Sequence, residues 1–148
     1  MKRASKSFLA LIVGASLAGL AMPVARATVD DALSAAHELA DPFTKQGFTV
    51  REDAWGGDLG VKEQKAVTAQ LFRGNEYYFW LATDTKGAVV TVHVYDSSGK
   101  LAESESKADG TAAWARVSPS RTGTYYAIVT ITRSPRERTH WALVYGYK

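Results

Sequence analysis

The chain has 148 residues and no cysteine, and its formal net charge at pH 7 is +3. Without cysteine, disulfide bonds, thiolate metal sites and cysteine nucleophiles are excluded, so a folded domain must rely on a packed core. Four of the basic residues lie within residues 1–27, and the rest of the chain holds 14 basic and 15 acidic side chains. That remainder has no net positive field with which to bind phosphates, so we expect no nucleic-acid partner.

Residues 1–27 have the pattern of an export signal. Basic residues precede an uncharged run at 8–24, and Ala25-Arg26-Ala27 supplies small residues where a signal peptidase reads. A membrane anchor is the competing interpretation, because the run approaches spanning length, but its glycines and Pro23 favour cleavage. We expect residues 1–27 to be a cleaved signal peptide, with a periplasmic or extracellular location and no stable membrane span afterwards.

The charges of the remaining residues are unevenly distributed. Residues 28–110 carry a net charge of −6, whereas residues 111–148 carry +5. Because residues 28–148 have the length of one domain, these opposite charges predict ion pairs within a single folded unit.

The first element after the signal is predicted to be an amphipathic helix. Thr28 is followed three positions later by Asp31, which is a capping-box pattern. Apolar residues then recur at helical spacing as far as Phe43. Pro42 predicts that the helix ends near Ala40, because the residue before a proline is disfavoured in the helical region.

The segment 48–60 predicts a loop rather than a regular element. It contains the sequence EDAWGGDLG, whose three glycines are typical of turns, and only residues 48–51 resemble a short strand. The expected organisation is therefore an N-terminal helix and loop at 28–57 and a β-sandwich domain at 58–148.

From residue 61 onward, short segments of strand-forming residues are separated by turn residues. The turn Asp96-Ser97-Ser98-Gly99, with Asp first and Gly last, is typical of a type I hairpin. No second helical run is present, so the chain predicts an all-β fold, an antiparallel jelly-roll-like β-sandwich of seven or eight strands with one short N-terminal α-helix. The strands are expected at 65–72, 76–83, 88–95, 100–106, 111–117, 124–131 and 140–147.

Three segments, LFRGNEYYFWL, VHVYDSSGKLAESES and VSPSRTGTYYAIV, resemble in order and spacing the bacterial pre-peptidase C-terminal (PPC) domains. The resemblance covers roughly residues 58–147, and with the preceding helix the chain is also similar to small exported bacterial proteins built on that domain. It implies a secreted, non-catalytic, jelly-roll-like sandwich. Some members bind calcium and collagen through clustered acidic residues, which only Glu52, Asp53 and Asp58 approach here. The run after Leu81 is poor in Asp, so we expect no metal or other cofactor.

Alternation along the strands assigns their aromatic residues to two faces. By the family pattern, Tyr125 and its alternate neighbours face the core. The opposite set faces outward, and three interpretations of it stay open: the helix covers it, a partner protein docks on it, or its rings form a sugar platform. The candidate binding residues are Tyr78, Trp80, Tyr95, Tyr126 and, on the last strand, Trp141.

No catalytic arrangement is visible in the sequence. The three histidines, His37, His93 and His140, lack a metal-ligand neighbour at helical or hairpin spacing. Glu103 and Glu105 alternate on a predicted edge strand, where charge blocks edge-to-edge pairing more simply than it forms a glycosidase pair. We therefore expect no enzyme, but an exported module that mediates protein or envelope-associated interactions; the alternative is a carbohydrate-binding module that uses surface Trp and Tyr.

Overall fold

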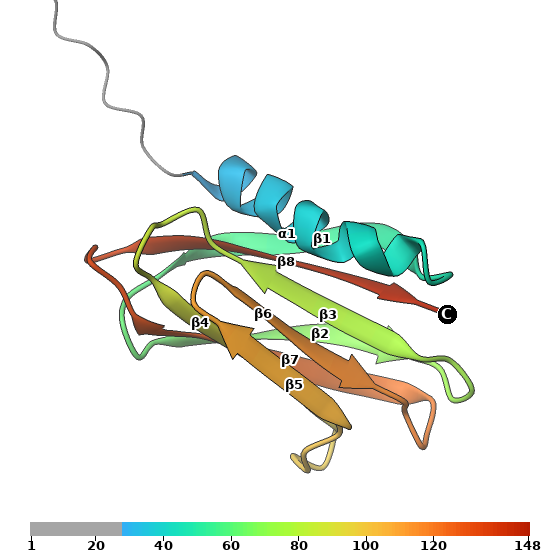
Figure 1. Cartoon of the computed structure of the whole chain (residues 1–148). Coiled ribbons are helices and arrows are strands. Elements are labelled where there is room, and N and C mark those ends of the chain that lie inside the picture. The colour runs from blue at the N-terminus through green and yellow to red at the C-terminus, as the bar shows by residue number, and fades with distance from the viewer. Residues whose placement is uncertain (1–27) are drawn as a thin grey trace, which may run out of the picture.

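The structure, a computed structural model, describes residues 28–148; the expected signal peptide at residues 1–27 lies outside the described residues. A helix and two sheets are stacked in three layers (Figure 1). The elements in chain order are α1 (Val29–Thr44), β1 (Thr49–Leu59), β2 (Gln64–Leu71), β3 (Tyr77–Ala82), β4 (Val89–Tyr95), β5 (Glu105–Asp109), β6 (Ala112–Val117), β7 (Gly123–Arg133) and β8 (Thr139–Tyr147).

The two sheets are antiparallel, with strand orders β1-β8-β3-β6-β5 and β2-β7-β4. Each strand lies in the opposite sheet from its predecessor except β6, which forms a hairpin with β5. The chain therefore winds back and forth across one core, as in a jelly roll. The predicted all-β sandwich with one N-terminal helix is confirmed.

The core between the sheets is built from one alternate set of side chains on each strand. Strand β4 shows this most clearly, because Val90, Val92 and Val94 are buried while the residues between them are half-buried. On β7, Tyr125 is buried and its hydroxyl donates a hydrogen bond to the Arg121 carbonyl oxygen at 2.7 Å. This bond back to the preceding turn resembles the tyrosine corner of sandwich domains and confirms the predicted facing of β7.

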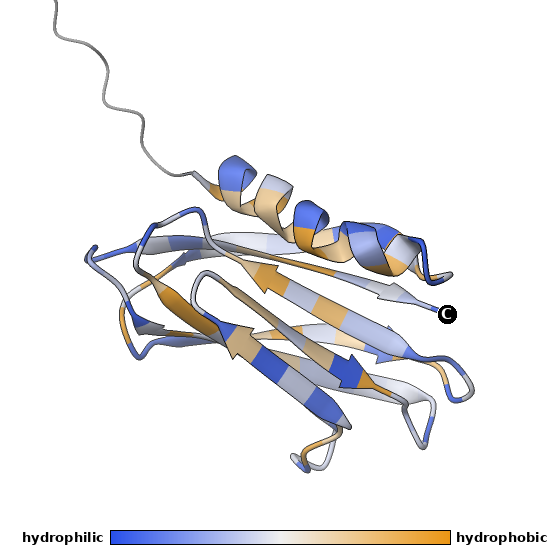
Figure 2. Cartoon of the chain, in the orientation of Figure 1, coloured by the Kyte–Doolittle hydropathy of each residue, from blue (hydrophilic) through white to orange (hydrophobic). Residues whose placement is uncertain are grey.

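Helix α1 covers the outer face of the five-stranded sheet and leaves the other sheet bare (Figure 1). Its hydrophobic side faces the sheet and its hydrophilic side faces outward (Figure 2). Ala32, Ala36 and Ala40 are buried against the sheet, and their small side chains bring the helix close enough to bury Trp80 completely. The interpretation in which the helix covers an aromatic face is therefore confirmed for β3.

The helix continues to Thr44, so the predicted end near Ala40 is wrong. The extra turn contains Pro42 and places the Phe43 ring against two aromatic rings of β3, 4.6 Å from Tyr78 and 5.3 Å from Trp80 between centroids. Aromatic burial of this kind stabilises the turn and outweighs the local preference of the residue before a proline.

The predicted loop at 48–60 is instead strand β1, and the predicted domain boundary at residue 57 falls inside it. One of its glycines, Gly56, allows close packing rather than a turn. A Cβ atom at Gly56 would lie 2.6 Å from Val29 Cγ1 of the helix. Glycine at this position therefore lets α1 approach the sheet, a role that its turn-like composition conceals.

The predicted strand at 100–106 is also corrected. The chain makes one isolated bridge, Tyr95 to Leu101, and then crosses to the other sheet, where β5 begins at Glu105. The Glu103 carboxylate accepts a hydrogen bond from the Val94 N–H at 2.9 Å and lies 2.7 Å from His93 Nδ1. The Glu103 side chain therefore supplies a hydrogen-bond acceptor to the edge of β4, where no continuous strand pairs with it. Glu105 lies on the exposed edge strand β5, as predicted.

Two adjacent tyrosines on β7 give a direct test of which face of this strand lies in the core. Replacing Tyr125 with Ala should cost about 3–5 kcal/mol, as core aromatic truncations do, and replacing it with Phe about 0.5–1.5 kcal/mol through the lost hydrogen bond. Tyr126→Ser is the matched control and should stay within about 0.5 kcal/mol, because Tyr126 faces outward. Urea midpoints measure all three, and a larger loss at Tyr126 would contradict the facing.

Candidate functional site

The five residues predicted as a binding site do not form one surface. Tyr78 and Trp80 are buried beneath α1, and Trp141 is buried in the core between the sheets. Only Tyr95 and Tyr126 remain half-exposed, on the outer face of the β2-β7-β4 sheet. The five residues do not share one outer face, because β3 and β8 belong to a different sheet from β4 and β7, a point that the sequence left open.

A groove opens on one side of the sandwich, between the edge strands β1 and β2. On the opposite side, β4 packs against β5 and β6, whereas β1 and β2 make few contacts with each other. Two adjoining hollows of about 210 and 550 Å³ occupy this opening. Both are lined by Arg51, Gln70, Phe72 and Tyr145, so they form one continuous groove, which we call the inter-sheet groove.

Aromatic rings form the floor and one wall of the inter-sheet groove. The Tyr145 ring stacks on Phe79 of the core at 5.3 Å and contacts Trp55 of β1 at 5.3 Å. On the β2 side, the Phe72 side chain is 53% exposed, the highest value among the large apolar residues that the structure describes. The Tyr77 hydroxyl accepts a hydrogen bond from the Phe72 N–H at 2.9 Å, which fixes the backbone at this position.

One cation lies at the rim of the groove. The Arg51 guanidinium is 5.9 Å from the centroid of the Tyr145 ring and 3.2 Å from the Asp53 carboxylate. The hydrogen bond to Asp53 raises the pKa of Arg51, and burial raises the pKa of Tyr145 while the Arg51 charge opposes that rise. An exposed pair of this kind contributes little stability, so the guanidinium is free to exchange Asp53 for a ligand at small cost.

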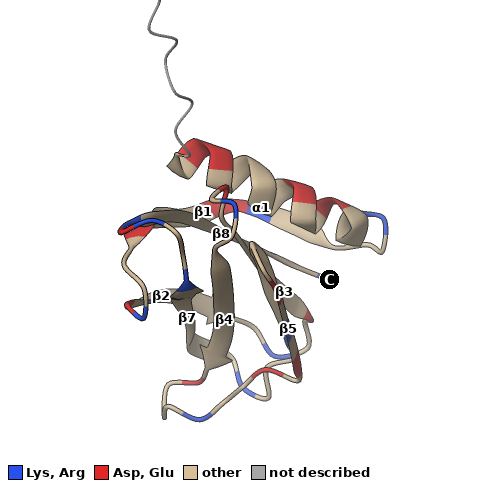
Figure 3. Cartoon of the chain, turned by 60° about the vertical axis from the view of Figure 1, so that its left-hand side comes forward, with Lys and Arg blue, Asp and Glu red and all other residues tan. Residues whose placement is uncertain are grey.

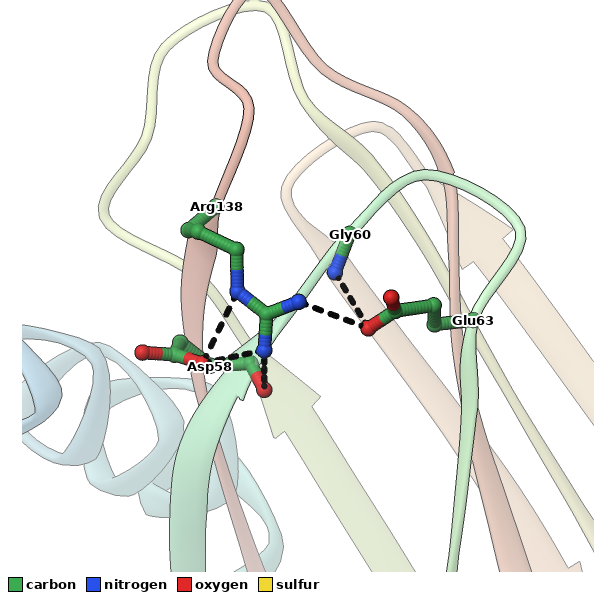
Figure 4. A network of polar contacts seen from close by, with 4 residues as sticks. All are labelled: Asp58, Gly60, Glu63 and Arg138. Atoms are coloured by element: carbon green, nitrogen blue, oxygen red, sulfur yellow. Dashed lines mark hydrogen bonds and ion pairs between the residues drawn. The ribbon is translucent and has the colours of Figure 1, made fainter.

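Towards the end of β1, away from Arg51, Arg138 forms the most connected polar network among residues 28–148 (Figure 4). Its guanidinium donates to the Asp58 carboxylate at 3.1 and 2.5 Å and to Glu63 Oε2 at 2.9 Å. The hydrogen bond from Arg138 lowers the pKa of Asp58, and that from the Gly60 N–H lowers the pKa of Glu63. The network ties the start of β8 to the end of β1 and to the turn before β2.

This network also bears on two sequence predictions. Arg138 pairs with Asp58 and Glu63, and Arg116 lies 2.7 Å from Glu76, so basic residues of the last part of the chain pair with acidic residues of the first, as predicted. The acidic residues considered for calcium are engaged differently: Asp58 is held by Arg138, and Asp53 by Arg51. Within residues 28–148, no three His, Asp or Glu side chains gather to hold a metal ion.

Sequence reasoning missed the inter-sheet groove because it placed residues 52–60 in a loop. Without β1 as an edge strand, Arg51 and Trp55 could not be set opposite Phe72. One signal was present: Phe72 directly follows the buried Leu71, so an apolar residue stands where the alternation calls for a polar one.

No family model matches the chain, and no curated protein matches it in sequence. The resemblance to the PPC domains therefore stays a prediction. The helix that the structure describes is too short and too polar to cross a membrane.

The Arg138 network predicts a pH-dependent contribution to stability. Because the folded pKa values of Asp58 and Glu63 are lowered, the contribution is complete above their ordinary values of 3.8 and 4.5 and is lost as the pH falls through the lowered ones. Arg138→Met should therefore reduce the urea midpoint at neutral pH, and the difference from wild type should shrink in acid. Arg136→Met is the control, since Arg136 forms no ion pair with a described residue. A difference that grows in acid would contradict the assignment.

Proposed function

We propose that this protein is an exported, non-catalytic β-sandwich module of the PPC type that binds an extended segment of a partner protein in the inter-sheet groove. The observation that carries the proposal is a groove with an aromatic floor that runs between two unpaired strand edges. The partner would be a protein of the periplasm, the envelope or the extracellular space.

The strand edges supply backbone partners for such a segment. Strand β1 pairs only with β8, and β2 pairs only with β7, so each has one side without a sheet neighbour. An extended peptide that adds to a free edge gains main-chain hydrogen bonds, and pockets for its alternate side chains give it specificity. The bulge between Val50 and Ala54 interrupts the β1 edge, so β2 is the better candidate for continuous pairing.

The aromatic residues supply the affinity. Trp55 of β1, Phe72 just after β2 and Tyr145 of β8 meet only in the folded protein. Tyrosine and tryptophan dominate the energetics of many interfaces, because they bury a large area with few rotatable bonds. Arg51 would select for a carboxylate or carbonyl group at the rim, since four of its five N–H donors do not bond Asp53.

The start of helix α1 is compatible with cleavage after Ala27. The Thr28 side chain accepts a hydrogen bond from the Asp31 N–H, and the Thr28 backbone nitrogen donates to the Asp31 carboxylate at 3.1 Å. If Thr28 became the N-terminus, its new ammonium group would face the Asp31 carboxylate. The capping box would then survive removal of residues 1–27.

The binding proposal can be tested by photo-crosslinking in producing cells. A photoreactive phenylalanine analogue at position 72 should trap a specific protein, and Trp55→Ala in the same chain should abolish the adduct. A synthetic peptide from the trapped region should then bind at least tenfold more weakly to Trp55→Ala, because truncation of an aromatic anchor costs roughly 2 kcal/mol.

The matched control carries the same analogue at position 126, on the outer face of the other sheet. It should not trap the protein captured from position 72. Equal capture at both positions, or no protein adduct at position 72, would overturn the groove as the binding site.

Export is tested independently. Mass spectrometry of the protein from the periplasm or medium should find its N-terminus at or near Thr28. An intact Met1 form fixed in membranes would contradict cleavage and would leave the membrane-anchor interpretation.

A further inference from the structure

The outer face of the β2-β7-β4 sheet has an unusual composition. It consists of every second residue of β2 from Gln64, of β4 from Thr91 and of β7 from Thr124. These positions hold Thr, Gln, Tyr, His, Ala and Ile, and none holds Asp, Glu, Lys or Arg. Elsewhere in residues 28–148 about one residue in four is charged. We call this surface the neutral face; Figure 3 shows β4 without a charged residue along its length.

The register of the strands sets the pattern of the neutral face. Tyr126 of the central strand lies directly between Tyr95 of β4 and Thr68 of β2. Residues opposite each other on paired strands have Cβ atoms about 4.5–5.5 Å apart, so the two tyrosine side chains start from neighbouring positions, with Thr68 on the next strand. Among residues 28–148, neither phenol hydroxyl has a hydrogen-bond partner. The groups are therefore available to a ligand.

The histidine of the neutral face is paired with a carboxylate. His93 Nδ1 lies 2.7 Å from Glu103 Oε1, and the Glu103 side chain is largely buried beside it. A proton on His93 would thus be balanced by this carboxylate.

We propose that the neutral face binds an uncharged polysaccharide. Such a polymer presents many hydroxyl groups and small apolar ring surfaces but no charge, which matches a surface of hydroxyls, amides and two phenol rings. A charged partner would lose hydration here without gaining an opposite charge. A protein interface usually has apolar anchors at its centre, whereas the aliphatic residues of this face are Ala66 and Ile128, and the exposed Leu101, bridged to Tyr95, lies at its edge.

The rigidity of the sheet favours this binding. Tyr126 and Ile128 lie on β7, which is held by a neighbour on each side, so their backbone is fixed before a ligand arrives. A preorganised surface loses less entropy on binding. Because a polysaccharide repeats its units, weak contacts at each sugar can still retain the protein on an insoluble polymer through rebinding.

The experiment measures depletion of the purified full-length exported protein by insoluble polysaccharides. Microcrystalline cellulose and chitin are the uncharged probes, and calcium alginate is the charged one. We expect retention on at least one uncharged polymer, little on alginate, and no loss in concentrated salt, because no ion pair is involved. Tyr126→Ala and Tyr95→Ala should each weaken retention at least tenfold, with an unchanged urea midpoint showing that both variants fold.

Phe72→Ala separates this proposal from the proposed groove function. It should leave retention unchanged, whereas a loss with Phe72→Ala but not with Tyr126→Ala would move the sugar site to the groove and overturn the inference. Absence of retention on both uncharged polymers would also overturn it. The inference would likewise be overturned if sedimentation showed that the protein is a dimer and that Tyr126→Ala makes it a monomer, because a second copy would then occupy the face.

Discussion

Strand β3 is apolar on both of its faces, and the rest of the architecture follows from the need to bury both of them. Phe79 and Leu81 face the core between the sheets, while Trp80 faces the opposite way and is fully buried. A sandwich of two sheets covers only one face of each, so this strand needs a third layer. Helix α1 supplies that layer, and Gly146 of β8 makes room beneath it, because a Cβ atom there would meet the Thr49 carbonyl oxygen at 2.6 Å and the Trp80 ring at 3.1 Å.

Helix α1 covers only one of the two sheets, so the two outer surfaces of residues 28–148 differ. The surface above α1 carries acidic groups along the helix (Figure 3), so it is hydrated and charged. The opposite surface is uncovered sheet, and the positions that form the neutral face hold no charged residue. The two sides of the sandwich differ as well: the crossing at 100–104 closes the β4 side, whereas β1 and β2 make few contacts with each other beyond the turn at 60–63 that joins them. Groove and neutral face meet at β2, where Thr68 and Gln70 belong to both.

The sequence was most informative where a single periodicity was at work. The alternation of β4 and β7 and the turn residues between strands predicted the sandwich and the buried position of Tyr125, because each strand there has one wet face. Prediction from the sequence failed where two layers of the fold, such as the helix and the sheet, meet. Glycines at 56–57 look like turn residues, yet the contact with Val29 that requires Gly56 exists only after the helix has docked. Likewise, sheet membership separates Trp80 from Tyr126, and only long-range pairing decides which strands are neighbours.

The pairing of β1 with β8 also governs the order in which this protein can fold. Thr49 pairs with Tyr147, so the first strand has no sheet neighbour until almost the whole chain is present. Closing so large a loop is entropically costly and makes formation of such a sheet slow. Before β8 arrives, β3 lacks one of its two neighbours and α1 lacks part of the surface on which it rests. Strand β8 therefore acts as the closing piece of the fold, and the aromatic side chains of β3 stay open to chaperones or to aggregation until it is in place.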